Sequence, residues 1–186
     1  YTPFAFDVSS KLNYGGTNTI AVRVDNIAWD TRNDIVPYTQ CDWFNYSGII
    51  HDVYLEVASP VSIVRTNVIP MDLNGKFETT AILLNKKSSS STVTASIKVY
   101  EASINQNNIQ SEFAKEIIGN EVSVTGTVQN TIVVDNQNTA VWKTDLTLTN
   151  PKLWNPKQPN LYVAKITITE NGNVVDEYYT QFGIRI

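Results

Sequence analysis

The chain has 186 residues, with 14 lysines and arginines against 18 aspartates and glutamates, and a formal net charge of −4. This length suits one large domain or two small ones, and the lack of a basic run argues against a nucleic-acid or anionic-membrane surface. No stretch approaches the roughly 20 apolar residues of a transmembrane helix. One cysteine and one histidine exclude an internal disulfide and a cysteine or histidine metal cage, so we expect no metal and no cofactor.

Most regular segments alternate apolar and polar residues, which predicts half-buried antiparallel strands. In chain order, the clearest runs lie at 20–24, 49–57, from 61 onward, 93–99, 142–148 and 162–168. Strands that recur about every 10–12 residues without a helical period are typical of a β-sandwich. The predicted fold class is therefore all-β.

Turn signals separate these runs. Asn74-Gly75 and Asn171-Gly172 predict two-residue hairpin loops, because both residue types tolerate positive φ. Residues 86–91 form a polar Lys/Ser loop, and the Asn/Gln-rich segment 104–115 predicts a short helical or irregular insert.

Ser59-Pro60 is the best domain boundary, because proline cannot continue a strand ladder and a new strand begins at once. Residues 61–186 hold roughly seven predicted strands, enough for an immunoglobulin-like β-sandwich. Residues 1–58 hold only three clear strands and one long loop. Three strands bury too little to form a sandwich alone, so this first part is expected to be incomplete.

A polar and aromatic cluster ends the long loop of the first part: Asp42, Trp43, Phe44, Asn45 and Tyr46. Aromatic rings offer flat faces to the C–H side of a sugar, while Asp and Asn oxygens accept hydrogen bonds from its hydroxyls. The cluster therefore predicts a carbohydrate contact. A buried aromatic corner of a sandwich is the structural alternative.

Three blocks of sequence, at 1–26, 42–57 and 150–185, include Gly15-Gly16-Thr17-Asn18, Asp42-Trp43-Phe44-Asn45-Tyr46-Ser47-Gly48 and Asn150-Pro151-Lys152-Leu153-Trp154. In order and spacing they resemble glycoside hydrolase family 2, which contains β-galactosidases, β-glucuronidases and β-mannosidases. The form of the second block is closest to the β-glucuronidase-like branch. The resemblance implies a sugar-binding (galactose-binding-like) jelly roll, an immunoglobulin-like sandwich and a catalytic TIM barrel. Residues 1–58 would be the C-terminal part of the jelly roll, and residues 61–186 the immunoglobulin-like domain.

The resemblance also implies the roles of the cluster. Asp42 would reach into the barrel pocket and bind sugar hydroxyls, with Asn45 nearby and with Trp43 and Tyr46 as further candidates for substrate contact. Retaining glycosidases need two carboxyl groups about 5–5.5 Å apart, and in this family both come from the barrel. We therefore expect a non-catalytic fragment. Its partners would be the missing barrel, the N-terminal half of the jelly roll and, in the intact enzyme only, carbohydrate.

Four further residues receive structural interpretations. Glu121 is predicted to be an exposed turn residue rather than a catalytic acid, and Trp154 to cover one end of the sandwich. His51 lies on an apolar face and is predicted to be a hydrogen-bonded core residue. Arg185 is predicted to be an unpaired surface arginine.

Two functional classes compete with the fragment of a glycosidase. The first is a stand-alone carbohydrate-binding or adhesion module, which requires a self-sufficient first domain. The second is a structural immunoglobulin-like domain of a cell surface, which leaves the Asp42 cluster unexplained.

Overall fold

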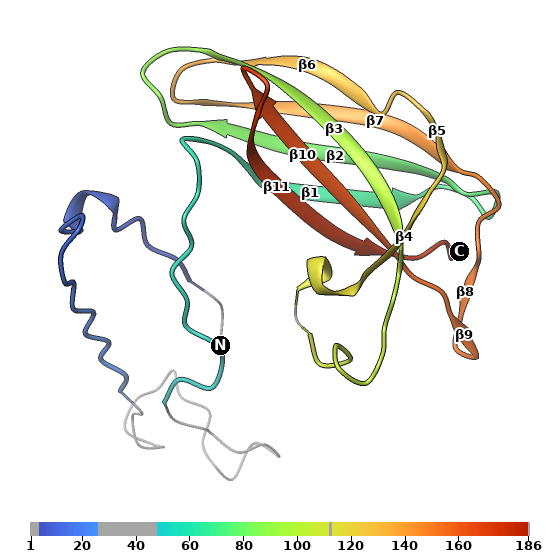
Figure 1. Ribbon diagram of the computed structural model, residues 1–186, viewed down its shortest axis with the longest axis horizontal. Coiled ribbons are helices and arrows are strands. Elements are labelled where there is room, and N and C mark those ends of the chain that lie inside the picture. Colours follow the sequence, from blue (N-terminus) through green and yellow to red (C-terminus); the bar gives the residue numbers. More distant parts are fainter. Residues whose placement is uncertain (1–3, 26–47, 112, 186) are drawn as a thin grey trace, which may run out of the picture. The chain divides into compact units, whose positions relative to one another are not determined.

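The computed structural model describes residues 4–25, 48–111 and 113–185. The chain divides into two units, Tyr1–Leu55 and Glu56–Ile186. All strands of the described residues lie in the second unit (Figure 1). The helices of the described residues are the short 3₁₀ turns Ser9–Lys11 and Ala114–Ile117, and in this part of the chain no helix is long and apolar enough to cross a membrane.

The second unit is an antiparallel β-sandwich, as predicted. One sheet has the order β1-β2-β7-β5, and the other has the order β11-β10-β3-β4, with β6 paired to β3. The strands of the first sheet are β1 (Val61–Pro70), β2 (Lys76–Asn85), β5 (Val124–Gly126) and β7 (Asn138–Leu148). Those of the second are β3 (Ser91–Ala102), β4 (Ile118–Val122), β6 (Gln129–Val134), β10 (Tyr162–Glu170) and β11 (Asn173–Phe182). The small hairpin β8 (Trp154–Asn155) and β9 (Gln158–Pro159) lies outside both sheets.

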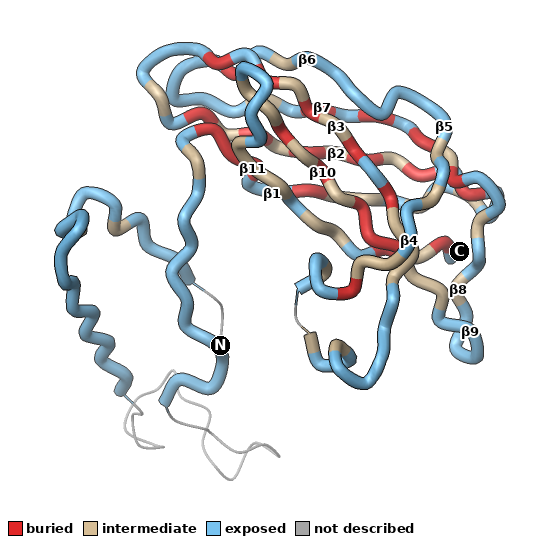
Figure 2. The backbone as a smooth tube through the Cα atoms, in the orientation of Figure 1, coloured by how far each residue is buried: buried red, intermediate tan, exposed pale blue. Residues whose placement is uncertain are grey.

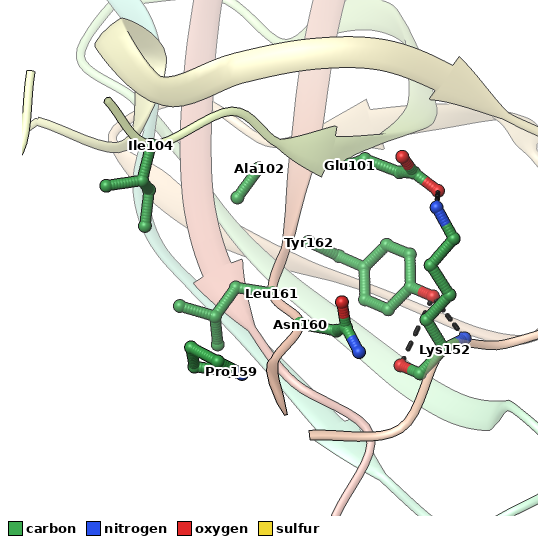
Figure 3. A pocket seen from close by; sticks show the side chains of 8 residues that line it. All are labelled: Glu101, Ala102, Ile104, Lys152, Pro159, Asn160, Leu161 and Tyr162. Carbon is green, nitrogen blue, oxygen red and sulfur yellow. Dashed lines mark hydrogen bonds and ion pairs between the residues drawn. The ribbon is translucent and has the colours of Figure 1, made fainter. Parts of the chain in front are cut away.

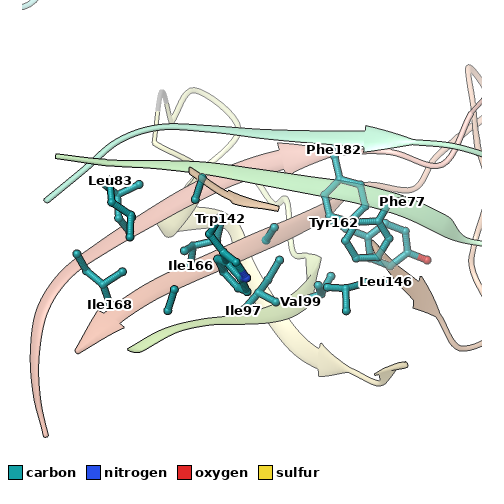
Figure 4. Packing of buried hydrophobic residues seen from close by; sticks show 14 of the residues in the cluster. Phe77, Leu83, Ile97, Val99, Trp142, Leu146, Tyr162, Ile166, Ile168 and Phe182 are labelled. Carbon is teal, nitrogen blue, oxygen red and sulfur yellow. The ribbon is translucent and has the colours of Figure 1, made fainter. Parts of the chain in front are cut away.

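The core lies between the two sheets, where the alternation of the sequence placed it. The predicted inward series of β3, β7 and β10 are buried, including Val93, Trp142 and Ile166 (Figures 2 and 4). Because side chains of a strand alternate between faces, each apolar residue of these runs reaches the same side of its sheet. At one end of the core the Phe182 ring packs between Phe77 and Tyr162, with centroid distances of 5.1 and 5.5 Å.

Side-chain hydrogen bonds link the two sheets where β1 runs beside β11. A register shift between Ile63 and Arg65 interrupts the β1 ladder. The Ile63 N–H nearby donates to the Asp176 carboxylate at 2.7 Å, and the Thr66 and Thr180 hydroxyls form a hydrogen bond further along. These contacts satisfy polar groups of an edge that would otherwise need water.

The predictions for the first part of the chain were wrong in one respect. Residues 4–25 and 48–60 contain no strand, and apolar side chains of the expected inward faces, such as Ile20, Val53 and Leu55, are exposed. A strand exists only when a neighbouring strand completes its ladder, and in the described residues these segments have no such neighbour. Alternation therefore identified residues suited to a strand but could not supply the partner.

The two predicted hairpin loops differ. Asn171 and Gly172 form a two-residue loop between β10 and β11, both with positive φ (52° and 80°), as predicted. The connection at Asn74-Gly75 is longer, spanning residues 71–75, and the Asp72 carboxylate accepts hydrogen bonds from the backbone N–H groups of Asn74 and Lys76. This side-chain cap replaces the tight turn that the dipeptide alone suggests. The loop between β2 and β3 spans 86–90, one residue shorter than predicted, and of the predicted insert the described residues 104–111 and 113 lie outside helices and strands while 114–115 begin a 3₁₀ turn.

Thr79 and Thr144 are cross-strand partners with opposite hydrogen-bonding status. Both side chains are buried. The Thr144 hydroxyl donates to the Thr127 carbonyl at 2.7 Å, whereas the Thr79 hydroxyl has no partner among the described residues. A buried polar group without a hydrogen bond costs stability, and a satisfied one contributes to it.

We therefore predict opposite signs for one substitution at these two positions. Thr79→Val should raise the free energy of unfolding by about 1 kcal/mol, and Thr144→Val should lower it by about 1 kcal/mol. Urea unfolding of the two variants beside the wild type measures both. Destabilisation by Thr79→Val equal to that of Thr144→Val would show that the Thr79 hydroxyl has a partner.

The ion pair between Lys87 and Glu170 fastens the β2–β3 loop to the end of β10. Both Glu170 oxygens lie 2.7 Å from the Lys87 Nζ atom, and the Glu170 side chain is 18% exposed. The hydrogen bond from Lys87, followed by one from Ser91, holds the pKa of Glu170 below its usual value. A carboxyl with a lowered folded-state pKa stabilises the fold above its unfolded pKa, and this contribution is lost as the pH falls through the folded value.

Glu170→Gln should accordingly destabilise the sandwich at neutral pH by at most about 1 kcal/mol. The difference from the wild type should shrink as the pH falls below the ordinary glutamate value of 4.5. Thermal unfolding at several pH values measures this. Glu121→Gln, which breaks the more exposed pair with Lys98, is the matched control and should leave the melting temperature unchanged. A Glu170→Gln difference that persists at acidic pH would contradict the assigned ion pair.

Candidate functional site

The residues of the predicted substrate contact lie outside the described residues. They are Asp42, Trp43, Asn45 and Tyr46, together with Phe44. Their site is therefore still a prediction. On the C-terminal side of the cluster, Gly48 has a φ of 85°, a conformation that favours glycine and allows a sharp change of chain direction.

His51 does not have the environment predicted for it. It is exposed, as are its neighbours on the expected face, Ile49 and Val53. The prediction of a hydrogen-bonded core histidine assumed a strand at 49–57. Without that ladder the alternating side chains have no common buried face.

A shallow depression of about 370 Å³ lies at one end of the sandwich (Figure 3). Residues from β3, β10 and the preceding segments line it: Glu101, Ala102, Ile104, Lys152, Pro159, Asn160, Leu161 and Tyr162. Register explains the convergence, because Tyr162 lies directly opposite Glu101 in the β3–β10 ladder. The insert after β3 adds Ile104 to the rim.

The polar groups of this depression are engaged with one another. Lys152 and Glu101 form an ion pair at 2.5 Å, and the hydrogen bond to Glu101 raises the pKa of Lys152. The Tyr162 hydroxyl accepts a hydrogen bond from the Lys152 backbone N–H at 2.7 Å, and the Asn160 side-chain amide donates to the Leu153 carbonyl at 3.0 Å. A protonated, paired lysine is a poor general base. The arrangement joins the 150–160 segment to β3 and β10.

Trp154 and Arg185 form a second contact at the C-terminal end of the chain. The Arg185 guanidinium carbon lies 4.8 Å from the Trp154 ring centroid, and the Trp154 backbone N–H donates to the Ile184 carbonyl at 3.0 Å. Leu153 forms a parallel bridge with Ile184. The prediction of an unpaired Arg185 was therefore wrong, because a cation stacks favourably on an indole face even when both are partly exposed.

A polar network covers the outer face of β10 and β11. Glu177 lies 2.6 Å from the Lys165 ammonium and accepts a hydrogen bond from the Tyr179 hydroxyl at 2.7 Å. Burial opposes the charge of Glu177, but the hydrogen bonds from Lys165 and Tyr179 outweigh it and hold its pKa below the usual value. Burial, followed by the hydrogen bond to Glu177, raises the pKa of Tyr179. Lys165 and Glu177 neutralise each other's charge, and the Tyr179 hydroxyl adds a hydrogen bond to the pair.

Glu121 is exposed, as predicted, but it lies on β4 rather than in a turn, and it pairs with Lys98 at 2.9 Å. The partners of these lysines and acids could not be read from the sequence, because folding brings together residues that lie 12 to 83 positions apart. The aromatic–proline segment around Trp154 was the one feature of the sequence that predicted a contact at the end of the sandwich where Trp154 meets Arg185.

The second unit is a two-sheet antiparallel β-sandwich, which places the chain in the all-β class. The family model "Glycosyl hydrolases family 2" matches residues 63–185. The chain therefore belongs to glycosyl hydrolase family 2.

Named relatives match the whole chain. A "Putative beta-glucuronidase" of Formosa agariphila is 26% identical over 189 residues, which cover 100% of this chain and 19% of the relative. "Beta-galactosidase BoGH2A" of Bacteroides ovatus is 24% identical over 185 residues, which cover 100% of this chain and 19% of the relative. The crystal structure of a Bacteroides uniformis β-glucuronidase is similar with a TM-score of 0.63 and 17% identity, over 86% of this chain and 18% of that one. The chain spans about a fifth of the length of these relatives.

Proposed function

We propose that this chain is a non-catalytic part of a retaining family 2 β-glycosidase that acts on a terminal β-linked sugar. Residues 1–58 would belong to a sugar-binding jelly roll, and residues 61–186 to the immunoglobulin-like scaffold domain. The observation that carries the proposal is the family match over the sandwich. The relatives named β-glucuronidase and β-galactosidase, which the chain matches over its full length, support it further.

The ionic pairing of the acidic residues supports a scaffold role. Retaining hydrolysis needs two carboxyl groups about 5–5.5 Å apart, facing a sugar. The described sandwich instead pairs five of its glutamates with lysines on its surface: Glu78, Glu101, Glu121, Glu170 and Glu177. At Glu170 and Glu177 the hydrogen bonds from lysine help to hold the pKa below its usual value, which makes these two groups poor proton donors.

The exposed apolar side chains of the first unit support a jelly roll completed by other strands. Val22, Val24 and Ile49 are each about half exposed, and Phe4 and Phe6 are more so. Such a series of exposed apolar side chains is suited to burial against a neighbouring sheet. Further strands of a longer protein would provide that sheet.

Within this proposal Asp42 contacts substrate hydroxyls, with Asn45, Trp43 and Tyr46 beside it. In the full-length enzyme, Asp42→Ala should lower kcat/KM for an aryl β-glycoside roughly 10- to 100-fold, the loss expected for hydrogen bonds to a charged group. Asp52→Ala, at an exposed carboxylate ten residues further along, is the matched control and should have no effect. Unchanged kinetics of a normally folded Asp42→Ala enzyme would refute the role of Asp42.

The 186-residue chain alone should not hydrolyse chromogenic β-glucuronides or β-galactosides. Isothermal titration of the same chain with mono- and oligosaccharides distinguishes the competing class. Millimolar or tighter binding would favour a stand-alone carbohydrate-binding module. No binding here, together with activity of the full-length protein, would favour the proposed scaffold.

A further inference from the structure

Strand β6 forms an exposed edge of the five-stranded sheet. It pairs with β3 over six residues, from Ser91 opposite Val134 to Ser96 opposite Gln129, without a register shift. In the described part of the chain no strand is hydrogen-bonded to its other edge. Figures 1 and 2 show β6 along the margin of the sandwich, exposed over most of its length. A regular edge of this kind presents unpaired N–H and C=O groups to a further strand.

The sheet edges at β1, β11, β5 and β4 carry features that discourage such pairing. Strand β1 has a register shift and a proline at its end, and β11 lies alongside it with Asp176 bonded to Ile63. Strand β5 is only three residues long. Strand β4 has a register shift in its pairing with β3 and carries the charged Glu121.

The sequence of the β6 edge lacks these features. Strand β6, residues 129–134, contains no charged residue and no proline. Val133 is 59% exposed on β6, and Thr131 beside it is also exposed. High β-propensity, no net charge and no proline are the properties of segments that pair readily with other strands.

We propose that β6 pairs antiparallel with β6 of a second copy of this chain. A two-fold axis places the same segment opposite itself, and self-pairing is tolerated when the segment carries no like charges. The uncharged β6 meets this condition, whereas β4 would bring Glu121 toward its own copy. Pairing would join two five-stranded sheets into one continuous sheet. Because the contact is a single short strand, the dimer is weak and depends on protein concentration.

Sedimentation velocity of the 186-residue chain over a range of concentrations tests this proposal. We expect a reversible monomer–dimer equilibrium that Thr131→Lys weakens at least tenfold, because like charges then meet across the axis. Thr125→Lys changes the net charge equally at an exposed threonine of β5 in the other sheet, and it should leave the equilibrium unchanged. Both variants should retain the wild-type melting temperature.

Hydrogen exchange at low and high concentration locates the contact. Amides of residues 129–133 should become more protected as the dimer forms. A chain that stays monomeric at all concentrations overturns the proposal. Association that Thr131→Lys and Thr125→Lys weaken equally, or that leaves the β6 amides unprotected, also overturns it.

Discussion

Replacing Phe77 by alanine is expected to lower the free energy of unfolding of the sandwich by about 3–5 kcal/mol. The ring is fully buried and packs 5.1 Å from Phe182 at one end of the core. Its removal loses the transfer free energy of the ring and leaves a cavity that two antiparallel sheets cannot close by moving together. Urea unfolding followed by tryptophan fluorescence or circular dichroism measures the loss.

Two further variants make the Phe77 result specific. Val141→Ala, on the adjacent strand β7 but 63% exposed, should change stability by less than about 0.5 kcal/mol. A double-mutant cycle with Phe182→Ala should give a coupling of about 0.5–1.5 kcal/mol for the ring pair. A loss below about 1 kcal/mol for Phe77→Ala would contradict the core position of the ring.

Asn85→Ala is expected to cost about 3 kcal/mol, although Asn85 is polar and lies at the end of a strand. The side chain is fully buried. Its amide donates to the Ser89 and Val134 carbonyls at 2.8 and 3.0 Å, and its oxygen accepts from the Lys87 N–H at 2.9 Å. Alanine leaves three backbone groups without these partners, and each unsatisfied buried group is costly.

Asn85→Asp separates the contribution of the two hydrogen bonds that Asn85 donates from that of the one it accepts. Aspartate keeps the acceptor for Lys87 but directs a buried negative charge at two carbonyl oxygens, so the variant should be less stable than Asn85→Ala at pH 7. Burial raises the pKa of such a carboxyl, so the variant should regain stability as the pH falls and the group is protonated. Asn138→Ala, at the exposed cross-strand partner of Asn85, is the control and should be nearly neutral. Equal losses of stability for Asn85→Ala and Asn138→Ala would contradict the role assigned to the Asn85 hydrogen bonds.

Local pattern predicted much of the sandwich because the period of a strand is a local property. Ala95, Ile97 and Val99 alternate with polar residues, and each is buried as expected. Asn171-Gly172 specified its own turn, since both residues accept positive φ without help from neighbours. Asn74-Gly75 did not, because the carboxylate of Asp72 reorganised the loop.

The sequence by itself determined the all-β class and the inward faces of the sandwich strands. It also determined the membership of family 2, and the family match over residues 63–185 confirmed that membership. Only the tertiary structure decided which strands have partners, and thus that 20–24 and 49–57 are not strands in this chain. It also decided that Arg185 stacks on Trp154 and that Lys87 binds Glu170. The physical reason is that alternation acts between adjacent residues, whereas ladders, ion pairs and stacking join residues that the chain brings together only on folding.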